Sequence, residues 1–172
     1  DRRGEQQAGG TGSYLFILIG QILIVTLCLT VLIIFLAVFR NDIFQDNSKI
    51  TFILILIILQ VLMTRLAVDS QSFSIYLLPF CVLPIIIRVF YDTRIALFVH
   101  LVTILIVAFI APNHFEFAFM QLISGMIAIF SFVNMHNRSQ IFISAALIFL
   151  TYSIAYIGIT IIQEGGTDVL TW

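Results

Sequence analysis

The chain has 172 residues, of which 61% are hydrophobic and 10% are charged, with a mean hydropathy of +1.14 and a formal net charge of −1. A soluble domain carries about 25% charged residues, so a water-soluble fold could not cover this much apolar surface. The near-neutral charge gives no reason to expect a nucleic-acid partner. We therefore predict an integral membrane protein whose main surroundings are the lipid bilayer.

The apolar runs indicate helices and not strands. Residues 50–59 are apolar on nearly every side, whereas the strands of membrane barrels alternate apolar and polar residues. Only helices and closed barrels pair every backbone N–H and C=O group in the bilayer core. The predicted fold class is all-α, a polytopic bundle of about six transmembrane helices with a truncated seventh.

In chain order, residues 1–13 are polar and glycine-containing, and we expect a flexible lead-in, either an extracytoplasmic juxtamembrane segment or a remnant of cloning. A chain that begins Asp-Arg-Arg is also expected to be a piece of a longer one. The transmembrane bundle is predicted over 14–172, and 169–172 is expected to begin a seventh span. The six predicted spans lie near 14–39, 50–68, 73–90, 95–111, 115–133 and 140–162.

Basic residues predict the orientation. If the N-terminus is outside, the turns at 40–49, 91–94 and 134–139 face the cytoplasm, whereas the outer turns at 69–72 and 112–114, like the segment 163–168, contain no lysine or arginine. Cytoplasmic loops of membrane proteins carry the excess of these residues, so we expect an extracytoplasmic N-terminus. The inner turns and the adjoining helix ends contain Arg40, Lys49, Arg88, Arg94 and Arg138, against Arg2, Arg3 and Arg65 on the outer side.

Ionisable side chains within the predicted spans are candidate functional residues, because each is costly in lipid. Arg65 precedes Asp69 by one helical turn, and we expect an ion pair at the outer headgroups. Arg88 and Asp92 have the same spacing at the inner end of the third span. They are either a positive-inside anchor or, with Arg94, a clamp that moves when the bundle moves.

Pro79 and Pro84 fall within one predicted span, where each removes a backbone donor. The resulting kink either shapes a cavity or hinge, or is passive geometry. His100 is either a hydrogen-bonded core histidine or a proton-sensing or ligand-binding group. The candidate intramembrane polar residues are His100, Gln21, Gln60, Gln121 and Arg65, and Gly20, Ser124 and Gly125 are expected to allow close helix approach.

The sequence contains no phosphate-binding loop, no HExxH, no GxSxG and no CxxC motif. Cys28 and Cys81 both lie in apolar runs and are expected to be small core residues. We therefore predict no catalytic residues, no metal site and no cofactor in this chain.

Residues 76–100 carry a more specific pattern, YLLPFCVLPIIIRVFYDTRIALFVH. It resembles the membrane region of the bacterial seven-transmembrane receptors that carry an intracellular HD hydrolase. Segments 113–117, 128–131 and 162–165 are similar to that family too, so the resemblance covers roughly 14–172. Within the first stretch the similarity is carried by Pro79, Pro84, Arg88, Asp92, Arg94, Ala96 and Leu97.

The resemblance implies a parent protein of three parts in the bacterial inner membrane: an extracytoplasmic sensor, the membrane bundle and a cytoplasmic HD phosphohydrolase that hydrolyses cyclic di-AMP. It implies that the inner ends around Arg88, Asp92 and Arg94 couple sensor to hydrolase. The chain has no His-Asp dipeptide, so the catalytic domain is absent from it and no enzymatic activity is expected of this fragment. A homodimer is left open.

Two other functions fit the residues. Six spans in fewer than 200 residues are also typical of the substrate-binding subunits of vitamin transporters, for which Gln21, Gln60, His100 and Gln121 would have to line a cavity. The chain could also be a membrane anchor with no conformational role.

Overall fold

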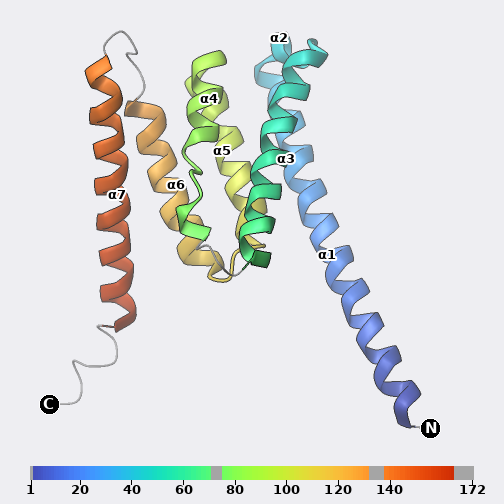
Figure 1. The fold of residues 1–172 in the computed structure, drawn as a ribbon. Coiled ribbons are helices and arrows are strands. Elements are labelled where there is room, and N and C mark those ends of the chain that lie inside the picture. Colours follow the sequence, from blue (N-terminus) through green and yellow to red (C-terminus); the bar gives the residue numbers. More distant parts are fainter. Residues whose placement is uncertain (1, 71–74, 132–137, 165–172) are drawn as a thin grey trace, which may run out of the picture. The chain divides into compact units, whose positions relative to one another are not determined.

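We describe a computed structural model of the chain over residues 2–70, 75–131 and 138–164 (Figure 1). The chain divides into an N-terminal unit, residues 1–46, and a C-terminal unit, residues 47–172. The described residues form helices and no strands. The elements are α1 (Arg2–Phe39), α2 (Asn41–Phe44), α3 (Asn47–Ser70), the 3-10 helix η1 (Ile75–Leu77), α4 (Val82–Phe90), α5 (Thr93–Ala108), α6 (His114–Ser131) and α7 (Arg138–Glu164).

The N-terminal unit is one long helix followed by a short one. α1 is already helical at Arg2, so most of the lead-in that was expected to be flexible is helical instead. Its first residues include arginine, glutamate, glutamine and alanine, which are good helix formers, and they extend an apolar helix that needs no new nucleus. Arg40 leaves the helical conformation with φ −144° and ψ 61°, and its carbonyl accepts bonds from the N–H groups of Ile43 and Phe44.

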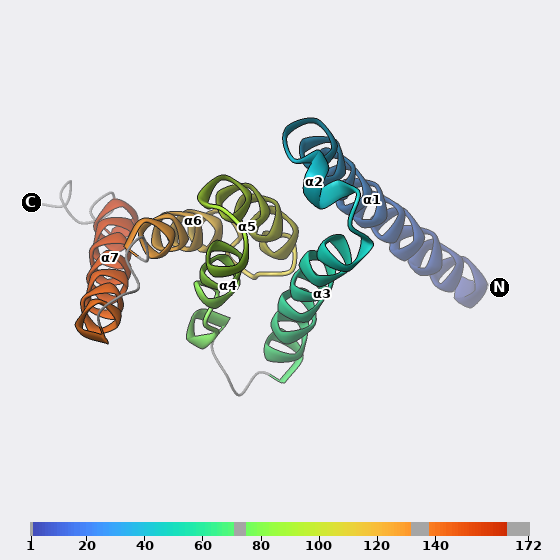
Figure 2. The same cartoon turned by 90° about the horizontal axis from the view of Figure 1, so that it is seen from above.

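In the C-terminal unit α4 and α5 lie between α3 and α6, and α7 packs against α6 (Figure 2). Most of the buried residues of this unit are apolar, and a few polar side chains are buried among them. A core cluster joins η1, α5 and the start of α6, with the Phe80 and Phe117 rings edge to face at 5.0 Å between centroids. Its buried members are Ile75, Phe80, Ile104, Val107, Ala108, Ala111 and Phe117.

Four helical stretches are long and apolar enough to cross a membrane: Leu15–Phe39, Asn47–Ser70, His114–Ser131 and Ile141–Ile162. They correspond to the first, second, fifth and sixth predicted spans. The fourth predicted span is the shorter apolar helix α5, which has 16 residues. The third is interrupted, with η1 and the nine-residue α4 replacing one helix. The count of six spans is therefore not confirmed.

The prolines explain the interruption of the third predicted span. Pro79 lies before α4, where its carbonyl accepts a hydrogen bond from the Val82 N–H at 3.0 Å. Pro84 is the third residue of α4, in the first turn, where an N–H would have no partner within the helix. The two prolines thus lie on either side of a helix start, and the single kinked helix that the sequence suggested is not observed.

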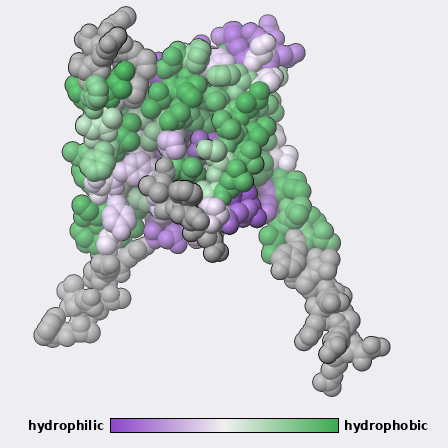
Figure 3. Space-filling model, viewed as in Figure 1, coloured by the Kyte–Doolittle hydropathy of each residue, from purple (hydrophilic) through white to green (hydrophobic). Residues whose placement is uncertain are grey.

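Hydrophobic residues dominate the sides of the helices, and strongly hydrophilic residues gather toward their ends (Figure 3). In the C-terminal unit the exposed residues include Ile58, Phe130 and Phe149. In water such a surface would drive aggregation, whereas in a bilayer it contacts acyl chains. The distribution supports a membrane protein.

Candidate functional site

His100, in the middle of α5, packs directly on the backbone of α6. A Cβ atom added to Gly125 would collide with the His100 imidazole ring, so only glycine leaves room for it. His100 is 1% exposed, and its Nε2–H donates to the backbone carbonyl of Gln121 at 3.0 Å. The prediction of a hydrogen-bonded core histidine is confirmed, as is the close helix approach at Gly125.

Gln121 connects α6 to α7 as well as to α5. Its side-chain Oε1 accepts a hydrogen bond from the Tyr152 hydroxyl of α7, and its backbone carbonyl also accepts one from the Ser124 hydroxyl at 3.2 Å. The Gln121 side chain is completely buried, yet its Nε2 has no hydrogen-bond partner among the residues that the structure describes. Gln121 is therefore the residue at which polar contacts from three helices meet.

Cys81 brings the start of α4 to the same place. Its thiol and the Tyr152 hydroxyl both interact with the Ser124 side chain. We call the set Cys81, Gln121, Ser124 and Tyr152 the polar cluster. It draws on α4, α6 and α7, and His100 adjoins it from α5.

A second polar contact joins α6 and α7 farther along. The Ser131 hydroxyl donates to Ser144 Oγ at 2.6 Å, and the Ser144 hydroxyl donates to the Ser131 carbonyl at 3.3 Å. The contact between α6 and α7 therefore has hydrogen bonds at two levels, one at Tyr152 and one at Ser144.

Of the four polar residues that a transport site would require, the structure brings two together. His100 and Gln121 are in contact. Gln60 lies on α3, where its backbone carbonyl accepts a hydrogen bond from the Thr64 hydroxyl at 2.8 Å. Gln21 lies on α1 in the other unit and is exposed. No specific observation favours the transport reading.

Sequence reasoning missed Tyr152 and the Ser131–Ser144 pair. The available signal was weak: a tyrosine in the middle of an apolar run, and one serine near the end of each of two neighbouring spans. Hydroxyl groups within spans commonly bond the carbonyl four residues earlier, as Thr151 does with Leu147, so spacing does not distinguish interhelical hydroxyls.

The basic residues of the α4–α5 turn lie where the sequence predicted a helix end, but not on one helix. α4 ends at Phe90 and Asp92 is the N-cap of α5, so Arg88 and Asp92 are not one turn apart on a continuous helix. The Nε atom of Arg88 is buried and has no hydrogen-bond partner in the described part of the chain. The Tyr91 hydroxyl donates to the Lys49 carbonyl at 3.4 Å, which ties this turn to the start of α3.

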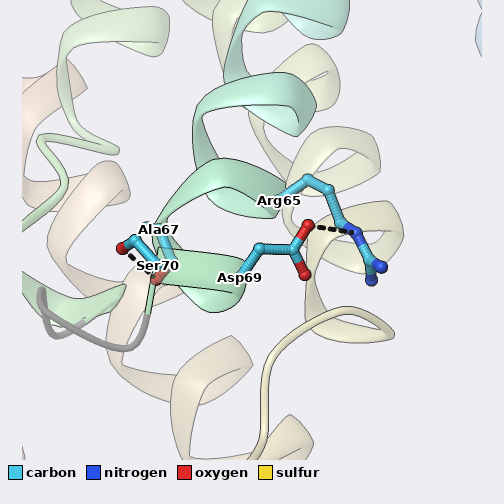
Figure 4. Close-up of polar contacts among 4 residues, drawn as sticks. All are labelled: Arg65, Ala67, Asp69 and Ser70. Carbon is cyan, nitrogen blue, oxygen red and sulfur yellow. Dashed lines mark hydrogen bonds and ion pairs between the residues drawn. The ribbon is translucent and has the colours of Figure 1, made fainter.

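Arg65 and Asp69 form the predicted ion pair on α3, with 3.2 Å between Nε and Oδ2 (Figure 4). Both side chains are more than half exposed, so the pair is a surface feature of the helix end. Among residues 2–70, 75–131 and 138–164, no three His, Cys, Asp or Glu side chains are grouped so that they could hold a metal ion.

The comparison with protein families decides the classification. A family model described as "7TM receptor with intracellular HD hydrolase" matches residues 15–172. The chain belongs to this family. The match covers the transmembrane receptor region of the family, whose hydrolase lies in another domain. No curated protein and no solved structure matches the chain.

Proposed function

We propose that this receptor region transmits a signal from an extracytoplasmic domain to a cytoplasmic HD phosphohydrolase that acts on a cyclic dinucleotide such as cyclic di-AMP. The observation that carries the proposal is the family match over residues 15–172. The apolar helices support a location in the membrane, which we propose to be the bacterial inner membrane.

We further propose an extracytoplasmic N-terminus and six crossings, the third made by η1 with α4 and the fourth by α5. The support is the distribution of lysine and arginine. The starts of α3 and α5 and the end of α4 lie at one end of the C-terminal unit (Figure 1), and this end carries Lys49, Arg88 and Arg94.

The α4–α5 turn is the proposed coupling element. Arg88 lies in the last turn of α4 and Arg94 in the first turn of α5. The Tyr91–Lys49 bond links the turn between them to α3, so movement of one helix would displace the ends of the others. A ligand of the outer domain can shift the bundle only by its difference in affinity for two packings. The change from one packing to the other would move the α4–α5 turn, and this movement would act on the cytoplasmic domain.

The test is hydrolysis of cyclic di-AMP by the full-length protein in membranes, with and without its outer domain. Arg88→Gln should abolish the dependence of the rate on the outer domain while leaving the membrane level normal. Arg65→Gln is the matched control, because it removes an arginine from the opposite end of α3. A rate that still depends on the outer domain in Arg88→Gln would contradict the coupling role, and absence of hydrolysis in the wild type would contradict the substrate.

A further inference from the structure

The polar cluster lies near the middle of α6 and α7 and at the start of α4. His100, which adjoins it, is the eighth of sixteen residues in α5, and Tyr152 is the fifteenth of twenty-seven in α7. Cys81 is the N-cap of α4, so the interrupted backbone between η1 and α4 reaches the same level. In a bilayer, irregular backbone is tolerated where protein buries it or where it lines a polar site. Interrupted helices near the midplane are a frequent place for ligands.

Gln121 has unused hydrogen-bonding capacity in this cluster. Its backbone carbonyl accepts from His100 and Ser124, and its Oε1 accepts from Tyr152. Its Nε2 is a buried donor that finds no acceptor within residues 2–70, 75–131 and 138–164. Buried donors are almost always paired. We therefore expect this N–H group to donate to an acceptor outside the described residues.

We propose that the polar cluster binds the carbonyl oxygen of a neutral, lipid-soluble molecule, with Gln121 Nε2 as the donor. The ligand is neutral because the cluster contains no cation: Arg65 lies near one end of α3, and Arg88 lies in the last turn of α4. A carboxylate or phosphate there would be a buried charge without a partner. This site is independent of the proposed coupling to the hydrolase.

Two sources could supply such a carbonyl: an ester of the bilayer lipid itself, or a diffusible molecule. The test uses the full chain in nanodiscs of ether-linked phosphatidylcholine, which has no carbonyl. The probes are 1,2-didecanoylglycerol, which has two ester carbonyls, and 1,2-didecylglycerol, whose ether links have none. The readouts are the melting temperature and the rate at which N-ethylmaleimide alkylates Cys81, with Cys28 on α1 as the internal control.

We expect didecanoylglycerol to raise the melting temperature and to slow Cys81 alkylation about fivefold, the ratio that one neutral hydrogen bond gives. Didecylglycerol should do neither, and the Cys28 rate should be the same with both. Gln121→Leu should abolish the difference and Gln60→Leu should retain it. If nanodiscs of ester-linked lipid, without added glycerol, already give the higher melting temperature and the slower Cys81 alkylation, the ligand is the bilayer lipid. If they do not, the ligand is a diffusible molecule.

Equal effects of the two glycerols on both readouts, with no difference between ester and ether bilayers, would overturn the proposal. So would a difference that persists in Gln121→Leu. Gln121→Met is the second variant should the leucine variant fail to fold, and the comparison on the wild-type chain decides the matter without either. If Cys81 is not alkylated in any bilayer, the melting temperatures decide it.

Discussion

α5 and α7 are both apolar helices of the C-terminal unit, but their surroundings are opposite. Ten of the sixteen residues of α5 are buried, including Val99 and Val107 with no exposed area. Among the described side chains of α7, residues 141–162, only Ser144 is buried. Hydropathy alone does not separate a helix buried in protein from one that faces lipid, because both are apolar.

The two helices also contact α6 by different means. α5 meets α6 mainly through shape: the His100 ring occupies the space that Gly125 leaves, and its Nε2–H donates to the Gln121 carbonyl. α7 meets α6 through hydroxyl groups, at Tyr152 and at Ser144. Adding bulk should therefore disrupt the first contact most, and removing hydroxyls should weaken the second by smaller steps.

The largest effect is expected from Gly125→Ala. The added methyl group overlaps the His100 ring, so either α5 or the ring must move, at a cost of about 3 kcal/mol of unfolding free energy. Thermal unfolding in detergent measures it. Gly158→Ala on α7 is the control, because its Cβ would meet nothing within 4 Å. Adding His100→Ala to Gly125→Ala should recover part of the loss, and a purely additive double mutant would contradict the packing argument.

Tyr152→Phe should cost about 1 kcal/mol, because it removes the hydroxyl that bonds Gln121 Oε1 and leaves that buried amide without a partner. Unfolding in detergent is again the measurement. Tyr156→Phe, whose ring is 63% exposed on the same helix, should change nothing measurable. Equal effects of the two substitutions would show that the Tyr152 contact does not hold α7.

Ser131→Ala should cost less, about 0.6 kcal/mol, because the Ser144 hydroxyl keeps its bond to the Ser131 carbonyl. Ser144→Ala loses both bonds and should cost more than Ser131→Ala. The Ser144 and Tyr152 levels are eight residues apart on α7, so the double variant Ser131→Ala with Tyr152→Phe should be additive. Strong coupling between them would mean that α7 is released as one unit.

The smallest effect is expected from Asp69→Asn, which breaks the Arg65–Asp69 ion pair. Exposed pairs contribute less than about 1 kcal/mol and are screened by salt, so the loss should shrink as ionic strength rises. Unfolding at low and high salt checks this. A large effect that does not depend on salt would show that the end of α3 is held more firmly than its exposure indicates.

Much of the architecture could be predicted because long apolar runs leave the backbone few choices in lipid. The spans at 14–39, 50–68, 115–133 and 140–162 correspond to helices of crossing length. The prediction was less accurate where local chemistry competes with that rule: proline interrupts the third span near Pro79, and helix-forming residues extend α1 to Arg2.

By itself the sequence determined that the chain is an all-helical membrane protein, that Arg65 pairs with Asp69 and that His100 is costly to bury unless bonded. It also carried the resemblance that the family match confirmed. The tertiary structure decided which polar residues meet. Gln121, Ser124 and Gly125 lie within five residues, but their partners His100, Cys81 and Tyr152 come from three other helices. Helix packing sets such pairings, and no local spacing in the chain encodes them.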